Sequence, residues 1–159
     1  MEESFISRVP RNFFVTSGAA AGTSFLVAFD NALRKAGIAD YNLLKVSSIL
    51  PAGARAVKGV DLVKGSLLPC VYAVAQGGPE GQVTAAVAVA VPAVSDRVGV
   101  IMEWSGIAPP SEAVAKVEAM AREAMALRDT PVKEILTAWA QSPQVKDGFA
   151  CAVAAVALW

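Results

Sequence analysis

The stretch Asn42-Leu-Leu-Lys-Val-Ser-Ser-Ile-Leu-Pro51 organises this chain of 159 residues. Its apolar residues predict a buried strand, Asn42–Ser48, that ends in a serine pair before two large aliphatic residues and a proline. At a strand end, the hydroxyl of Ser48 can be held against the carbonyl of Ser47, which is the geometry for an N-to-O acyl shift. The shift requires a strained peptide and an oxyanion donor nearby. The alternative is that both serines only terminate the strand.

An acyl shift at this position leads to cleavage of the backbone. The ester formed by Ser48 can lose its acyl part by β-elimination, and the dehydroalanine that remains hydrolyses to a pyruvoyl group. Cleavage of this kind divides the chain into an N-terminal piece, residues 1–47, and a C-terminal piece, residues 48–159, that begins with the pyruvoyl group.

The composition predicts one domain with a large apolar core. Hydrophobic residues make up 55% of the chain, and the mean hydropathy of +0.49 is high for a soluble monomer. We therefore expect sheets buried on both faces, or a surface covered in an oligomer. The longest charge-free runs, Gly65–Pro79 and Gly81–Ser95, are shorter than a helical membrane span and contain proline, so no membrane segment is expected. No secretion signal is expected in residues 1–8, which favours a cytoplasmic protein.

The charge balance and the missing histidine exclude several classes of function. Lysine and arginine together number 14, as do aspartate and glutamate, so the net charge is zero and no nucleic-acid partner is expected. The chain has no histidine, which removes Ser-His-Asp and Cys-His catalysis and most zinc sites. Acid–base chemistry must then come from a carboxylate, lysine, tyrosine or cysteine. Cys70 and Cys151 each lie in an apolar run, and we expect them to pack in the core rather than to form a disulfide or bind a metal.

Hydrophobic periodicity predicts a strand, a helix, four strands, a second helix and two further strands. This order predicts an α+β layered sandwich. The strand Gln82–Val91 is apolar on both faces, so a helix layer and a second sheet are expected to cover it. A loop at Gly18–Ser24 should lead into the first helix, with Ser24 as N-cap and Gly37 as terminator. The expected elements are Phe13–Ser17, the helix Phe25–Ala36, Asn42–Ser48, Leu67–Ala75, Gln82–Val91, Val98–Trp104, the helix Glu112–Leu127, Val132–Ala140 and Phe149–Leu158.

Several segments together carry a resemblance to a known family. From about Phe13 onward the chain resembles the pyruvoyl-dependent arginine decarboxylases, and Ser47-Ser48 combined with Ile101-Met-Glu103 is the specific part of the match. The resemblance implies a single-domain, four-layer αββα sandwich and a homotrimer with active sites between protomers. The matching segments are Asn42–Pro51, Ala28-Phe-Asp-Asn-Ala-Leu33, Ala36-Gly-Ile38, Gly99-Val-Ile-Met-Glu-Trp104 and Gly148-Phe-Ala-Cys-Ala-Val-Ala-Ala-Val-Ala-Leu-Trp159.

The resemblance also implies an activity. A pyruvoyl group derived from Ser48 would be the covalent cofactor, and L-arginine would be decarboxylated to agmatine and carbon dioxide. The keto group would form a Schiff base with the substrate α-amine and accept the electrons that carbon dioxide leaves behind. No external cofactor and no metal is then expected. The product would serve polyamine biosynthesis, or the reaction would consume protons in acid resistance.

Glu103 matches the glutamate that donates the proton in this family. Its neighbours Met102 and Trp104 could partly desolvate the carboxyl and keep it protonated near neutral pH. The alternative is a carboxylate of an edge strand that faces solvent. An aromatic and an acidic residue commonly follow this glutamate in the family, whereas this chain has Trp104-Ser105, which leaves the fine positioning of the carboxyl open.

Three further residues match binding or processing positions of the family. Asn42 matches an asparagine whose amide supports processing by stabilising the oxyanion; alternatively, it is a polar residue at a strand start or turn. Asp30 matches the aspartate that pairs with the substrate guanidinium, and in a trimer it could serve a neighbouring protomer. The alternative for Asp30 is an i,i+4 pair with Arg34 on the helix surface. Leu26, one turn earlier on the helix, would line the same pocket.

Other functions remain open at this stage. The chain could be a pyruvoyl-dependent decarboxylase of another amino acid, with histidine decarboxylase as a relative in fold. It could also be an unprocessed trimeric homologue without enzymatic activity. The presence of Ser47-Ser48, Asn42 and Glu103 together favours an enzyme, and Asp30 distinguishes arginine from other substrates.

Overall fold

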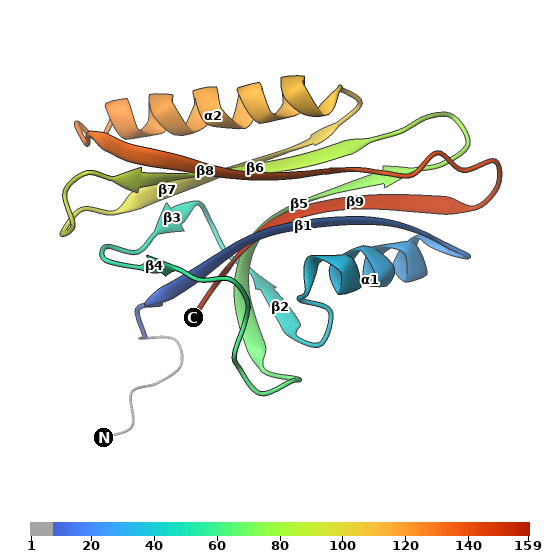
Figure 1. Cartoon of the computed structure of the whole chain (residues 1–159), viewed down its shortest axis with the longest axis horizontal. Coiled ribbons are helices and arrows are strands. Elements are labelled where there is room, and N and C mark those ends of the chain that lie inside the picture. Colours follow the sequence, from blue (N-terminus) through green and yellow to red (C-terminus); the bar gives the residue numbers. More distant parts are fainter. Residues whose placement is uncertain (1–7) are drawn as a thin grey trace.

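Each of the two helices covers the outer face of one of two stacked sheets (Figure 1). The computed structural model describes residues 8–159, so the expectation that residues 1–8 hold no secretion signal falls almost wholly outside the described residues. The elements in chain order are β1 (Asn12–Gly22), α1 (Phe25–Ala36), β2 (Asn42–Lys45), β3 (Ile49–Leu50), β4 (Arg55–Ala56), β5 (Leu67–Gly77), β6 (Thr84–Pro92), β7 (Gly99–Gly106), α2 (Pro110–Ala126), β8 (Val132–Gln141) and β9 (Phe149–Leu158). The expected αββα sandwich is confirmed.

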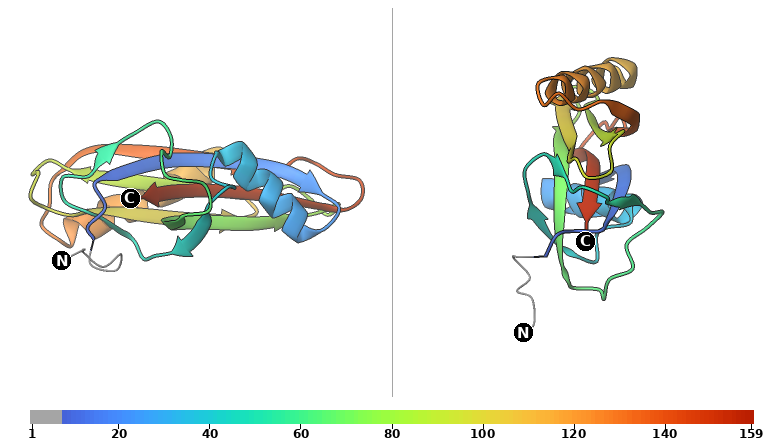
Figure 2. Two further views of the ribbon diagram at one scale, coloured as in Figure 1. Left: turned by 90° about the horizontal axis from the view of Figure 1, so that it is seen from below. Right: turned by 90° about the vertical axis from the view of Figure 1, so that its left-hand side faces the viewer.

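The larger sheet has five strands in the order β2-β5-β9-β1-β4. Its centre is antiparallel, because β9 pairs in opposite directions with β1 on one side and with β5 on the other. Its edges are parallel: β2 runs alongside β5 and β4 alongside β1. Figure 2 shows α1 lying across the outer face of this sheet.

The smaller sheet has four strands in the order β3-β7-β6-β8, and all its pairs are antiparallel. Residues of β6 alternate between two apolar layers, as period-two geometry requires. Val87 and Val89 pack between the sheets, whereas Ala86 and Ala88 pack against α2. The prediction that this strand is covered on both faces is therefore confirmed.

Helix α1 is bounded by local signals that were read correctly from the sequence. The hydroxyl of Ser24 accepts a hydrogen bond from the backbone N–H of Val27 (3.2 Å), and Gly37 ends the helix in the left-handed conformation with φ of 76°. Alanines at positions 28, 32 and 36 are buried against the sheet. The close approach requires Gly18 in β1, because a Cβ there would collide with the backbone of α1.

Two predicted elements were wrong in extent. The predicted loop Gly18–Ser24 is mostly strand: β1 continues to Gly22 and pairs with β9 throughout. The predicted buried strand Asn42–Ser48 is instead a short edge strand that ends at Lys45 and is largely exposed. Both errors have the same cause. The small residues from Gly18 to Gly22 and the mixed polar and apolar residues from Asn42 to Ser48 have weak propensities of their own, so pairing with the neighbouring strand decides where each strand ends.

Two remaining expectations concern the cysteines and the membrane. Cys70 and Cys151 are free and fully buried, in agreement with core packing. Burial raises the pKa of the Cys70 thiol to about 12 and that of Cys151 to about 11. From residue 8 to residue 159, neither helix combines the length and the apolar character that crossing a membrane demands.

Candidate active site

The serine pair lies where the chain passes from one sheet to the other. Strand β2 belongs to the larger sheet and ends at Lys45, whereas Ile49 and Leu50 form β3 in the smaller sheet. Ser47-Ser48 is part of the short segment between these two strands (Figure 1). Ser47 is exposed and Ser48 is half-buried, so the peptide bond between them is not enclosed in the core.

Ser48 is fixed to the edge of β7 by its backbone. Its carbonyl oxygen accepts a hydrogen bond from the N–H of Ile101 (2.9 Å), and the following residue, Ile49, is in register with Val100. The C-terminal side of the Ser47-Ser48 bond is therefore held by a sheet. This attachment also brings Ser48 close to the predicted proton donor.

Glu103 lies two positions beyond Ile101 on β7, on the same face of the strand. Glu103 is in register with Val87 of β6, whose side chain packs between the two sheets. The Glu103 carboxyl therefore lies on the face of β7 that is turned toward the larger sheet. The rise between Ile101 and Glu103 is about 7 Å. The structure thus brings Ser48 and Glu103 to one region of β7.

The Glu103 carboxyl is partly desolvated, as expected. Its side chain is 27% exposed, and burial raises the pKa of this carboxyl above the ordinary value. The nearby Lys45 ammonium opposes that shift. Met102 and Trp104, on the other face of β7, pack against the α2 layer. The alternative of a fully solvent-facing carboxylate does not fit this burial.

Lys45 is a residue of the site that the sequence analysis missed. Its Nζ lies 3.9 Å from Oε1 of Glu103 and donates a hydrogen bond to the carbonyl oxygen of Tyr72 (2.9 Å). The same ammonium lies 4.8 Å from the centroid of the Tyr72 ring. The available signal was that Lys45 is the single charged residue in the stretch Asn42–Pro51.

Asn42 is placed at the opposite end of β2 from the serine pair. Its side-chain nitrogen donates a hydrogen bond to the carbonyl oxygen of Gly65 (2.9 Å), and its backbone N–H bonds to Ser66 (2.9 Å). The amide therefore anchors the start of β2 within the described residues. The structure does not bring Asn42 into contact with Ser47 or Ser48 within the chain.

Asp30 and Leu26 lie on the exposed side of α1, with the Leu26 side chain 72% exposed. No lysine or arginine lies within 4.0 Å of the Asp30 carboxylate among residues 8–159, so the alternative pair with Arg34 is not formed. Figure 1 shows α1 on the outer face of the larger sheet, away from β3. Within one protomer, Asp30 is thus not brought to Ser48 and Glu103.

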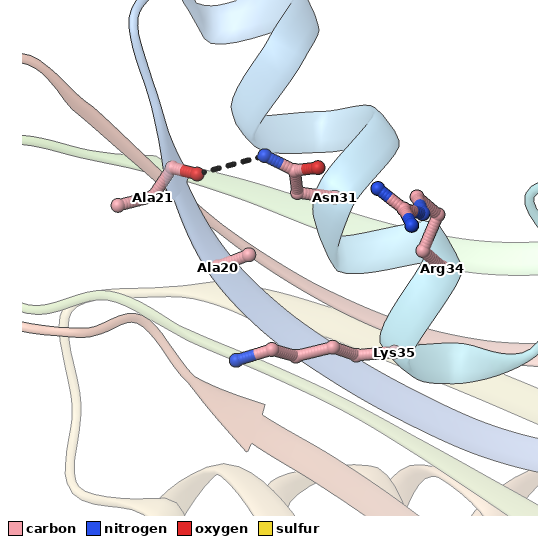
Figure 3. A pocket seen from close by; sticks show the side chains of 5 residues that line it. All are labelled: Ala20, Ala21, Asn31, Arg34 and Lys35. Atoms are coloured by element: carbon pink, nitrogen blue, oxygen red, sulfur yellow. Dashed lines mark hydrogen bonds between the residues drawn. The ribbon is translucent and has the colours of Figure 1, made fainter.

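One surface cavity of about 510 Å³ lies between β1 and α1 (Figure 3). Its lining contains Arg34, Lys35 and Asn31, whose side-chain nitrogen donates to the carbonyl oxygen of Ala21 (3.1 Å). None of the predicted site residues lines this cavity. It is therefore separate from the region around Ser48.

The residues around Ser48 fit a pyruvoyl group formed in place. The bond before Ser48 is accessible, its C-terminal side is fixed by β7 through the Ser48 carbonyl, and a partly desolvated carboxyl lies on the same strand. Backbone attachment at this point would hold the new N-terminus of residues 48–159 against Glu103. Ser48 would itself carry the group.

Comparisons with known proteins show the family to which the chain belongs. The family model described as pyruvoyl-dependent arginine decarboxylase (PvlArgDC) matches residues 12–159. A pyruvoyl-dependent arginine decarboxylase of Methanococcus aeolicus is 36% identical over 153 residues, which cover 96% of this chain and 92% of the relative. Its counterpart in Methanothermobacter thermautotrophicus is 41% identical over 124 residues, covering 77% of this chain and 80% of the relative. The pyruvoyl-dependent arginine decarboxylase of Methanocaldococcus jannaschii is 34% identical over 153 residues, which cover 96% of this chain and 92% of the relative. With a family match over nearly its whole length and relatives of this similarity, the chain belongs to the pyruvoyl-dependent arginine decarboxylase family.

Proposed function

We propose that this chain decarboxylates L-arginine to agmatine and carbon dioxide, using a pyruvoyl group that it makes from its own Ser48. Membership in the family carries the class of activity, a carboxy-lyase with a covalently bound pyruvoyl cofactor. The observation that supports the proposal most directly is the hydrogen bond from Ile101 to the carbonyl of Ser48, because it joins the serine pair to the strand that bears Glu103.

The cofactor would form by self-cleavage between Ser47 and Ser48. The Ser48 hydroxyl attacks the Ser47 carbonyl carbon, and the C–N bond breaks to give an ester and a free amine at residue 48. Loss of the α-proton of residue 48 then expels Ser47 as a carboxylate and leaves dehydroalanine. Addition of water and release of ammonia give the pyruvoyl group. The products are residues 1–47 with a normal C-terminus and residues 48–159 without a free amino terminus.

In the proposed reaction, Glu103 returns a proton to the substrate. A pyruvoyl group at residue 48 would accept the electron pair that carbon dioxide leaves behind. The substrate α-carbon must then be protonated, and Glu103 is the acidic residue of β7, the strand to which Ser48 is hydrogen-bonded. Partial burial favours its protonated form, which suits this role.

Arginine would be selected by Asp30 of a neighbouring protomer. A carboxylate can accept two parallel hydrogen bonds from a guanidinium, which an ammonium cannot match. Asp30 is exposed and has no cation beside it in the described part of the chain, and the exposed Leu26 precedes it by one helical turn. Both residues are therefore available to a second protomer. The homotrimer, the cytoplasmic location and the role in polyamine biosynthesis are part of this proposal.

The test is product analysis with carboxyl-labelled amino acids. Purified protein is incubated separately with L-arginine, L-lysine, L-ornithine and L-histidine, and released carbon dioxide and the amine product are measured. We expect agmatine from arginine and little product from lysine, which has the same charge but lacks the planar guanidinium that can donate two parallel hydrogen bonds. Preferential release from another amino acid would replace arginine as the substrate, and no release from any of them by a cleaved chain would overturn the proposal.

A further inference from the structure

Lys45 has no role in the proposed reaction, although it lies beside Glu103. Strand β2 ends at Lys45, and the chain then leaves the edge of β5 to reach the smaller sheet. The last backbone bond of this pairing runs from Val46 to the carbonyl of Cys70 (3.2 Å). The pairing of β2 with β5 does not extend to Tyr72. The Tyr72 carbonyl oxygen accepts a hydrogen bond from the Lys45 ammonium instead. The ammonium is thereby held at the gap through which the chain crosses between sheets.

The Lys45 ammonium makes different contacts with Tyr72 and with Glu103. The 2.9 Å contact to Tyr72 is a hydrogen bond, whereas the 3.9 Å distance to Glu103 is longer than that of a hydrogen-bonded ion pair. Lys45 therefore acts on Glu103 through its charge and leaves the carboxyl oxygens free for a substrate or a proton. The ring of Tyr72 further fixes the ammonium on its other side, at 4.8 Å from the centroid.

The other groups around Glu103 offer no competing charge. The neighbouring residue on β6 is Val87, and β3 contributes Ile49 and Leu50. Strand β9 has no charged residue, and β5 turns the apolar side chains of Val71 and Ala73 toward the layer between the sheets. Helix α2 packs on the opposite face of β7, where its Lys116 lies 4.5 Å from the Trp104 ring centroid and pairs with Glu112.

We infer that Lys45 is a positioning residue for Glu103: the Lys45 ammonium, 3.9 Å from the Glu103 carboxyl, orients that carboxyl beside Ser48. The inference rests on the proposed function, in which Glu103 donates a proton. Desolvation alone would raise the pKa of the Glu103 carboxyl and make it a weak acid. The nearby ammonium lowers this pKa, so that the carboxyl releases its proton more readily in each turnover. Lys45 lies in residues 1–47 and Glu103 in residues 48–159, so the pair would also connect the two pieces after cleavage.

The test is a carboxyl titration followed by nuclear magnetic resonance. Protein labelled with carbon-13 at glutamate side-chain carboxyls is prepared as parent, Lys45→Met and Lys45→Arg, and the Glu103 signal is assigned by its loss in Glu103→Gln. In Lys45→Met the Glu103 midpoint should rise by about one pH unit, a modest value because the Lys45 side chain is 55% exposed. Lys45→Arg should restore a midpoint close to that of the parent.

Lys116→Met is the matched control. It removes an ammonium that also lies beside β7, but on the face away from Glu103, and it should leave the Glu103 midpoint unchanged. The titration is repeated in a Ser48→Ala background for the parent and Lys45→Met, so that slow cleavage in a variant cannot obscure the coupling. A Glu103 midpoint that stays constant in Lys45→Met would overturn the inference.

Turnover separates this inference from the proposed function. In Lys45→Met, the pH at which kcat falls on the alkaline side should rise together with the carboxyl midpoint. A midpoint that rises while the kcat profile stays fixed would overturn the catalytic role of the pair and of Glu103 as donor. If the parent makes no agmatine but the midpoint still rises in Lys45→Met, the proposed function fails and the orienting contact stands.

Discussion

The ammonium of Lys45 lies 3.9 Å from the carboxylate of Glu103, and this pair connects a strand of the larger sheet to a strand of the smaller one. Between these two strands the chain passes through Ser47-Ser48. The bond proposed to be cleaved therefore lies between two strands whose side chains bring a partly buried acid and a cation together.

Glu103→Gln should separate processing from turnover. The amide keeps the shape of the side chain but cannot donate the required proton, so kcat should fall by about 10²–10⁴-fold while cleavage proceeds. Cleavage is followed by denaturing gel electrophoresis and turnover by agmatine formation. Glu118→Gln on α2 is the matched control and should behave as the parent. Equal turnover in Glu103→Gln and the parent would remove Glu103 as the proton donor.

The pH dependence of turnover should reflect the protonated form of Glu103. Burial raises the pKa of this carboxyl, and the neutral form is the one that donates, so kcat should be retained at low pH and lost as pH rises through the raised pKa. The measurement is kcat with saturating arginine across the pH range in which the protein stays folded. A decline centred at or below the ordinary pKa of glutamate would be inconsistent with a desolvated donor.

Asp30→Asn should weaken arginine binding without affecting cleavage. Loss of a charge-assisted pair costs about 1.5–3 kcal/mol, which corresponds to a rise in KM of roughly ten- to a hundredfold. Asp40→Asn is a suitable control, because Asp40 is also an exposed carboxylate near α1 but pairs with Lys64. If KM is unchanged in Asp30→Asn, another group recognises the guanidinium.

Gly18→Ala should destabilise the protein through the contact between β1 and α1. The added methyl group would meet the carbonyl oxygen of Ala32 and the nitrogen of Ala36, neither of which can move without shifting the helix. We expect a loss of about 1–3 kcal/mol in the free energy of unfolding, measured by urea denaturation. Gly59→Ala is the control, because no atom lies within 4 Å of a methyl group there and its backbone needs no positive φ. Equal stability of both variants would show that the helix does not depend on this contact.

The two pieces of the cleaved chain should remain together under native conditions. Residues 1–47 contain β1, which pairs with β9 over ten positions and lies inside the larger sheet, and α1, which covers that sheet. Removing this piece would expose the core between β9 and α1. Size-exclusion chromatography of cleaved protein should therefore give one peak that contains both fragments, and separate elution without denaturant would contradict the proposed packing.

The sequence predicted the features of the fold that depend on local patterns. Ser24 and Gly37 define α1 because capping requires only neighbouring backbone groups. The strand Phe149–Leu158 was predicted with its observed bounds, because a run of small and β-branched residues between turns can be covered on both faces. The four layers were implied by family resemblance, and apolar content alone was compatible with several arrangements.

The features that were missed depend on contacts between distant parts of the chain. The end of β2 at Lys45 is set by the departure of the chain from β5, which the run from Leu43 to Ser48 does not reveal. The proximity of Lys45 to Glu103 depends on how the two sheets are stacked. Asn42 and Asp30 remain predictions, because within one protomer neither contacts Ser48 and their proposed roles involve cleavage or a second protomer.

The most direct test of the account is intact-mass spectrometry of the purified protein under denaturing conditions. We predict two fragments, residues 1–47 and residues 48–159, with the larger one lighter than a simple hydrolysis product by one ammonia. Ser48→Ala should remain a single chain of the full 159 residues. A parent protein that also remains a single chain after prolonged warming would contradict self-cleavage at Ser47-Ser48, and with it the proposed source of the cofactor.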